Sequence, residues 1–443
     1  MTALWILLRP RRHSGVMASL QIVASAIATL LSFAVATFAV RLWAVPDESG
    51  AYHVLAVALS GLLLVPLLTL GSAATRLTVR SRDERLASLR LLGASTRTVQ
   101  AVSVVEATAL QLFGVVAGVV LSLPVPLAVA HLPLANDTSV VETAWLPTPV
   151  TVALLLILVS LAPISAMMGL RQVVLSPLGV ANRANAPRMS WVRLAIGAAA
   201  LVTGILLTQL ASPNWGITGI VIGFTIAVLI IMGVLGIVGP FVISLTARRR
   251  ANTTSDAARL VAARRNLEDP KAAWRGVSAI ALTSFILLPS GAMLGFLNAV
   301  ERSDSVLTHQ QIMLFADART VLFILVAISY VLTTCQIGVT QTAAIIENRE
   351  LYVALDRIGM PRREMDLARK HQAVGPAIIA IVGSAAAAAA LTLPLLLVAT
   401  TNSPLFVATT LVFLACGVLL VRVGVAAARS TLSRVLAAPS RGE

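Results

Sequence analysis

The chain has 443 residues, of which 58% are hydrophobic and only 12% charged, and its formal net charge is +15. Soluble domains carry about 25% charged residues, so a water-soluble fold is excluded. The apolar residues form runs of about twenty or more, long enough to span a hydrocarbon core of about 30 Å. Backbone groups in lipid must be satisfied within the protein, which leaves helices or a closed barrel. The runs are continuous rather than alternating, so the sequence predicts an all-α polytopic membrane protein.

In chain order, the apolar runs predict about ten transmembrane helices. Their ranges are 16–40, 52–74, 99–128, 149–170, 192–210, 217–245, 276–300, 321–345, 373–399 and 403–427. The third range carries Glu106 and then Pro124 and Pro126. We expect the two prolines to kink or end that helix, because proline cannot donate a helical hydrogen bond.

The basic residues predict the orientation of these spans. If the N-terminus lies inside, all of the 34 lysines and arginines fall in inner segments except Arg41, Arg302 and Arg319. Cytoplasmic loops carry the excess of basic residues, so both termini are expected in the cytoplasm. We expect the chain in the plasma membrane of a bacterium, because arginine and alanine dominate its basic and small residues.

The positive charge has two readings. A basic chain can bind nucleic acid, but here no aromatic residues interleave with the basic ones. Contact with anionic lipid and membrane topology explain the charge instead. We therefore expect membrane lipid, and no nucleic acid, among the partners.

The outer loops are predicted to be short, and the longest are 129–148 and 301–320. Neither is long enough for a folded extracellular domain. Their acidic residues are Asp137, Glu142, Glu301, Asp304 and Asp317. These acids either belong to solvated loops or line an entrance for a cationic substrate.

An internal repeat links two cytoplasmic segments at a constant offset of 266 residues. The first segment is 82–93, before the third span, and the second is 348–359, before the ninth. The matched pairs are Glu84 with Glu350, Leu86 with Tyr352, Leu89 with Leu355, Leu92 with Ile358, and Gly93 with Gly359. In each copy, apolar residues at i, i+3 and i+6 form one stripe of a short helix. Each glycine stands where a helix end favours a left-handed residue.

The repeat divides the chain into three parts. Residues 1–175 and 256–443 are expected to be two four-helix units, with a two-helix connector at 176–255 between them. Segments 8–15 and 266–276 each resemble an interfacial helix that leads into a span. Because both units have the same orientation, a pseudo-twofold axis along the membrane normal is expected.

These residues resemble the FtsX-like permease domain. The resemblance is carried by a long helix, the charged segment that ends in Gly93 or Gly359, and two hydrophobic helices. The duplicated layout is similar to the bacitracin-resistance type of permease. The resemblance covers spans 1–4 and 7–10, and it implies the membrane subunit of a type VII ABC transporter. Segments Glu84 to Gly93 and Glu350 to Gly359 would then dock on an ATPase dimer.

One feature departs from the family pattern. Bacitracin-type permeases carry a large extracellular domain between their seventh and eighth spans, where this chain has only the loop 301–320. The departure puts a bacitracin-like substrate and any coupling to a domain outside the membrane in doubt.

Sequence motifs for chemistry are absent. The two lysines, Lys271 and Lys370, are preceded by Pro270 and Arg369, so neither fits a phosphate-binding loop. The five histidines are scattered, which gives no support for a metal site. We expect a permease subunit that is not an enzyme and holds no cofactor, with ATP and magnesium bound by the partner ATPase.

Two residue assignments have a structural alternative. The leucine-striped helices either dock on an ATPase or lie on the membrane surface. Glu106 is expected inside a span, where an ionisable group is costly and therefore a functional candidate. It either forms a salt bridge or takes part in transport.

Three functions fit the sequence. The first is ATP-driven export or extraction of a small or amphipathic molecule, such as an antimicrobial peptide, an antibiotic or a lipid. The second is ATPase-linked signalling that controls a partner in the cell envelope. The third is ion-coupled secondary transport, which paired acids near the membrane midplane would mark.

Overall fold

The computed structural model describes residues 12–45, 50–80, 95–132, 145–174, 216–302, 308–393 and 404–427, and scattered positions at 195–206 and 396–400. The described residues form helices and no strand, which confirms the all-α prediction. Within the described residues, seven helices are long and apolar enough to cross a membrane, as expected for a multi-pass membrane protein. Their apolar segments are Ala18–Trp43, Ala101–Ala130, Thr148–Ser165, Ile230–Thr253, Pro270–Ala292, Gln311–Ile346 and Arg362–Leu391. Shorter apolar helical segments are Ala51–Leu64 and Leu414–Ala426.

The chain divides into two compact units. Unit 1 comprises Met1–Thr37, Leu67–Leu132 and Ser139–Ala181, and unit 2 comprises Phe38–Pro66, Pro133–Thr138 and Asn182–Glu443. The helices that contribute to unit 1 are α2 (Arg12–Trp43), α3 (Ala51–Arg80), α5 (Thr96–Ser122), α6 (Pro124–Ala130) and α7 (Thr148–Val174). Unit 2 holds the end of α2, the beginning of α3 and the helices from α9 onward.

In unit 1, α5 packs between α2 and α7. The α2–α5 seam, defined by Gln21 and Ser25 on α2 and by Gln111, Gly114 and Gly118 on α5, is polar and tight. The Nε2 of Gln21 donates to the carbonyl of Ala107 at 3.0 Å, and Ser25 Oγ donates to Gln111 Oε1 at 2.6 Å. A Cβ on Gly114 would lie 2.8 Å from the Ile22 carbonyl oxygen, so only glycine permits this approach. Small residues four positions apart are typical of close packing between membrane helices.

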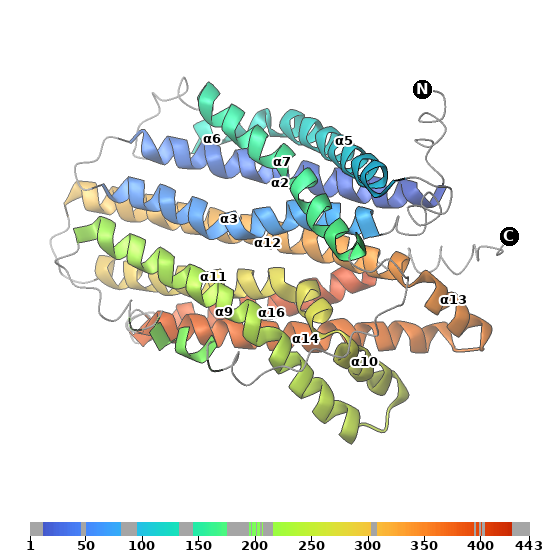
Figure 1. Cartoon of the computed structure of the whole chain (residues 1–443). Coiled ribbons are helices and arrows are strands. Elements are labelled where there is room, and N and C mark those ends of the chain that lie inside the picture. Colours follow the sequence, from blue (N-terminus) through green and yellow to red (C-terminus); the bar gives the residue numbers. More distant parts are fainter. Residues whose placement is uncertain are drawn as a thin grey trace. The chain divides into compact units, whose positions relative to one another are not determined.

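The described part of unit 2 contains seven further helices. They are α9 (Gly216–Thr253), α10 (Ala257–Glu268), α11 (Pro270–Arg302), α12 (His309–Glu347), α13 (Arg349–Arg357), α14 (Arg362–Leu391) and α16 (Pro404–Ala427). The long helices α9, α11, α12 and α14 alternate in direction, and α10 and α13 lie at the same end of the unit (Figure 1). An apolar cluster around the fully buried Phe285 joins α9, α11, α14 and α16.

The helix boundaries have local causes. Asp256 caps α10 by accepting the backbone N–H of Ala258 at 3.0 Å, and Pro270 begins α11 at a position that needs no N–H donor. In unit 1, α5 ends at Ser122 and α6 begins at Pro124. The predicted break of the third span at Pro124 is therefore confirmed.

Two expected boundaries are wrong. The loop placed at 301–320 is shorter than expected, because α11 continues to Arg302 and α12 begins at His309. The expected interfacial helix at 266–276 is instead divided at Asp269 between α10 and α11. The division occurs because Asp269 precedes a proline, which disfavours a helical residue before it.

Candidate functional site

The second of the two repeated segments forms α13, a nine-residue helix between the long helices α12 and α14. It ends in two tight hydrogen bonds: Met360 N donates to Leu355 O and Gly359 N donates to Asp356 O, both at 3.0 Å. This pattern is a Schellman motif, which requires a left-handed residue after the helix. Gly359 has φ +92°, so the predicted role of this glycine at the helix end is confirmed.

One side of α13 packs against its own chain. Tyr352 is only 6% exposed and contacts Ile345 of α12 and Met365 of α14. Leu355 and Met360 pack against the same cluster and are partly buried. These contacts fix α13 in its orientation between the two long helices.

The rest of the same apolar face of α13 is exposed. Ile358 is 81% exposed and Leu351 is 45% exposed. The two residues are seven positions apart and therefore share a helix face. The predicted docking stripe did not include Leu351, although its spacing of seven residues from Ile358 could have indicated it. Of the predicted docking stripe, Ile358 is available to a partner, whereas Tyr352 and Leu355 turn inward because they complete the α12–α14 cluster.

Of the remaining predicted docking residues, the structure describes some and not others. Glu350 lies in the first turn of α13. Glu84, Leu86, Leu89, Leu92 and Gly93 lie outside the described residues.

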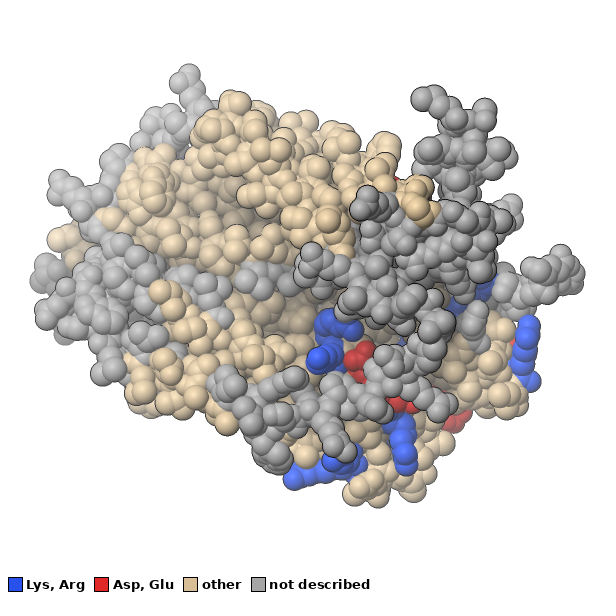
Figure 2. All heavy atoms as spheres, viewed as in Figure 1, with Lys and Arg blue, Asp and Glu red and all other residues tan. Residues whose placement is uncertain are grey.

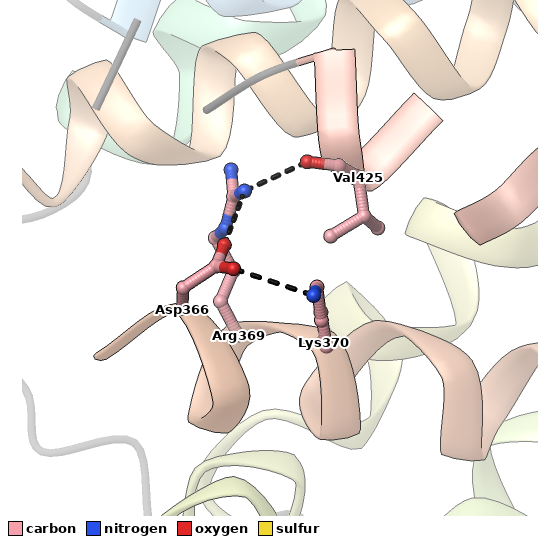
Figure 3. A network of polar contacts seen from close by, with 4 residues as sticks. All are labelled: Asp366, Arg369, Lys370 and Val425. Carbon is pink, nitrogen blue, oxygen red and sulfur yellow. Dashed lines mark hydrogen bonds and ion pairs between the residues drawn. The ribbon is translucent and has the colours of Figure 1, made fainter. Parts of the chain in front are cut away.

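A polar network ties the beginning of α14 to the end of α16 (Figure 3). Arg369 is buried, and its Nη2 donates to the Val425 carbonyl at 2.7 Å and to Asp366 Oδ1 at 3.0 Å. Lys370 Nζ lies 3.4 Å from Asp366 Oδ2. Val425 belongs to the last turn of α16, where carbonyls lack helical partners and a cation is favourable. The network therefore links the segment next to α13 with a second membrane helix.

Glu106 lies in α5, inside the apolar segment Ala101–Ala130, and is partly buried. This placement confirms that Glu106 is an acid within an apolar helix. The neighbouring Ala107 carbonyl accepts the hydrogen bond from Gln21, so Glu106 adjoins the α2–α5 seam.

Asp317 is neither in a solvated loop nor at an open entrance, which corrects both expectations for this residue. It is buried in α12 and accepts a hydrogen bond from the Tyr52 hydroxyl at 2.6 Å. Arg41 is also buried and interacts electrostatically with Asp317. A buried charge needs such a partner. The sequence separation between these residues left no local signal of their pairing.

The described residues contain no cluster of three or more His, Cys, Asp or Glu side chains that could hold a metal ion. No protein-family model, curated protein or solved structure matches the chain. The interpretation of α13 therefore rests on its own residues and on its repeat.

Proposed function

We propose that the chain is the membrane-spanning permease subunit of an ABC transporter. A separate ATPase, which binds ATP and magnesium, would drive export or extraction of a small or amphipathic substrate. The observation that carries the proposal is α13: a short amphipathic helix, held between two membrane helices, that exposes Leu351 and Ile358. Exposed apolar residues on a rigid helix are typical of a protein-binding surface.

The duplication supports two docking helices in one chain. Helices α5 and α14 begin at Thr96 and Arg362, which are 266 residues apart, the offset of the sequence repeat. Under the proposal, α2, α3, α5 and α7 form one FtsX-like unit, and α11, α12, α14 and α16 form the other. With a connector between them, the chain would have about ten spans related by a pseudo-twofold axis along the membrane normal. Two docking helices would suit the two grooves of an ATPase dimer.

The contacts around α13 support a route for coupling. Tyr352 joins α13 to α12 and α14, and Arg369 joins the start of α14 to the end of α16. A movement of α13 would therefore be passed to three membrane helices by direct contact, as coupling through packed elements requires.

The charge distribution supports cytoplasmic termini in a bacterial plasma membrane. On the face seen in Figure 2, the described Lys and Arg side chains gather at the end of unit 2 that carries α10 and α13. Arg41 was an exception to the sequence-based orientation. Its burial beside Asp317 explains the exception, because a paired internal charge is not a topology signal.

The docking proposal is tested by the double variant Leu351→Asp, Ile358→Asp. The full-length chain is purified through a tag from its native membrane, and the bound ABC ATPase is quantified. We expect a loss of about tenfold or more, because charges would replace the centre of an apolar contact. A control variant separates loss of docking from loss of folding. Val261→Asp on α10 also places a charge at an exposed apolar position, since Val261 is 46% exposed, and it is measured in parallel.

The control variant should retain the ATPase. Equal ATPase recovery from the double variant and from the unchanged chain would refute docking through α13. Transport and signalling are then separated by reconstituting the complex in vesicles: export requires ATP-dependent movement of a substrate, whereas signalling requires only a change in a partner's activity.

A further inference from the structure

A cleft of about 370 Å³ lies between α9, α10 and α14, near the end of α9, where three consecutive arginines precede its last three residues. Its polar part is formed by Arg250, Thr254, Arg259, Asn266 and His371. Its apolar part is formed by residues such as Ile243, Val374, Pro376, Ile378 and Ile379. None of the described residues that line the cleft is acidic. The cleft is therefore basic at one end and apolar at the other.

Arg250 points into this cleft rather than away from it. Its Nη1 lies only 2.7 Å from the position that a Cβ on Gly375 would occupy, so the guanidinium rests over the backbone of α14. The absence of a side chain on Gly375 makes room for it. Arg259 is partly engaged, because its Nε lies 3.3 Å from Asp256 Oδ2.

Asn266 lines the cleft and has a buried acceptor. Pro376 has no N–H, so the Gln372 carbonyl four residues earlier lacks its helical donor. Asn266 Nδ2 donates to that carbonyl at 3.2 Å. Because a carbonyl can only accept, the amide atom that faces it is the nitrogen. Asn266 is 6% exposed, and its Oδ1 has no hydrogen-bond partner among the described residues. A buried acceptor without a donor is costly and suits a ligand that carries a hydroxyl or an amine.

We propose that this cleft binds the head group of an anionic glycerophospholipid from the leaflet next to α10 and α13. The phosphodiester would lie against Arg250, Arg259 and His371, a head-group hydroxyl would donate to Asn266 Oδ1, and an acyl chain would cover the apolar part. Basic pockets between membrane helices are typical sites for such head groups. The inference depends on the membrane placement of the chain and not on an ATPase partner.

The test measures binding of phosphatidylglycerol to the full-length chain in detergent by native mass spectrometry. We expect Arg250→Gln and Gly375→Ala each to weaken binding by about tenfold, because each removes a charge-assisted contact from the cleft. Gly375→Ala keeps every charge and only displaces the guanidinium. The matched controls are Arg249→Gln, next to Arg250 but outside the cleft lining, and Gly383→Ala, whose added Cβ meets no atom within 4 Å.

The controls should change binding by less than about twofold. Phosphatidylmethanol, which lacks the hydroxyl, should bind several-fold more weakly than phosphatidylglycerol. Equal losses in Arg249→Gln and Arg250→Gln would show diffuse surface attraction and overturn the proposal. Displacement of the lipid by millimolar glycerol 1-phosphate would also overturn it, because the ligand would then be a soluble phosphate ester.

Discussion

Two helix seams, one between α2 and α5 and one between α11 and α14, are built from different chemistry. The α2–α5 seam uses hydrogen bonds from Gln21 and Ser25 and the close approach at Gly114 and Gly118. The α11–α14 seam, which includes Phe285, Ala377 and Ala380, belongs to an apolar cluster. At the offset of 266, Gln111 corresponds to Ala377 and Gly114 to Ala380.

The difference shows two ways to join helices in a membrane. Lipid removes most of the hydrophobic driving force between helices, so tight packing and hydrogen bonds must hold them together. The first seam gains its specificity from backbone proximity and polar pairs. The second belongs to an apolar cluster that includes Phe285 and several alanines of α14. At the sequence offset of 266 residues, the two seams therefore differ in their contacts.

The largest effect is expected at the glycine approach. In Gly118→Ala the new Cβ would lie 2.5 Å from the Ala26 carbonyl oxygen and 2.5 Å from the Thr29 Cβ. Overpacking against backbone should lower the free energy of unfolding by about 3 kcal/mol, measured by denaturant unfolding in detergent. Gly383→Ala on α14 has open space and should leave stability equal or higher. Equal effects of the two variants would contradict the close α2–α5 approach.

A smaller effect is expected in the apolar seam. Phe285→Ala leaves a cavity in the cluster. Because the helices stay in an apolar medium, the loss of packing should cost about 2 kcal/mol of unfolding free energy, less than the same change in a soluble core. Phe323→Ala on α12 is the control, because Phe323 is exposed and should change stability by less than about 0.5 kcal/mol. The same unfolding experiment measures both variants. An unchanged unfolding free energy in Phe285→Ala would show that this ring does not stabilise the seam.

The smallest effect is expected from the polar pair in the first seam. Gln111→Leu removes the bond from Ser25 Oγ and the bond that Gln111 Nε2 makes to the Leu158 carbonyl at 3.1 Å. Interhelical hydrogen bonds in membranes contribute little each, so we expect a loss of about 1 kcal/mol. Thr334→Val, which removes a hydroxyl bonded within its own helix, should change stability less. A larger loss than for Phe285→Ala would reverse the ranking of the two seams.

The sequence predicted the features that depend on local composition. Apolar runs located the long helices, Pro124 located a break, and Gly359 located the end of α13. Tertiary pairing was not predictable from one sequence. Asp317 and Arg41 were assigned to outer segments, because only the fold brings them together. The direction of Tyr352 was missed for the same reason, since its cluster joins three helices.

Some missed features had a local signal. Gly114 and Gly118 have the spacing of a close helix contact, and Pro376 necessarily frees the Gln372 carbonyl. The role of Asn266 depends on that carbonyl, but its pairing with a residue 106 positions away requires the structure. Spacing therefore indicates where a helix needs a partner, and the fold decides which residue supplies it.

The central claim is that one chain carries two equivalent helices that engage an ATPase dimer. Native mass spectrometry of the complex, purified through a tag on this chain, tests it most directly. The account predicts one copy of the 46.3 kDa chain with two ABC ATPase subunits. A chain that carries no ATPase, or a single ATPase subunit per chain, would contradict it.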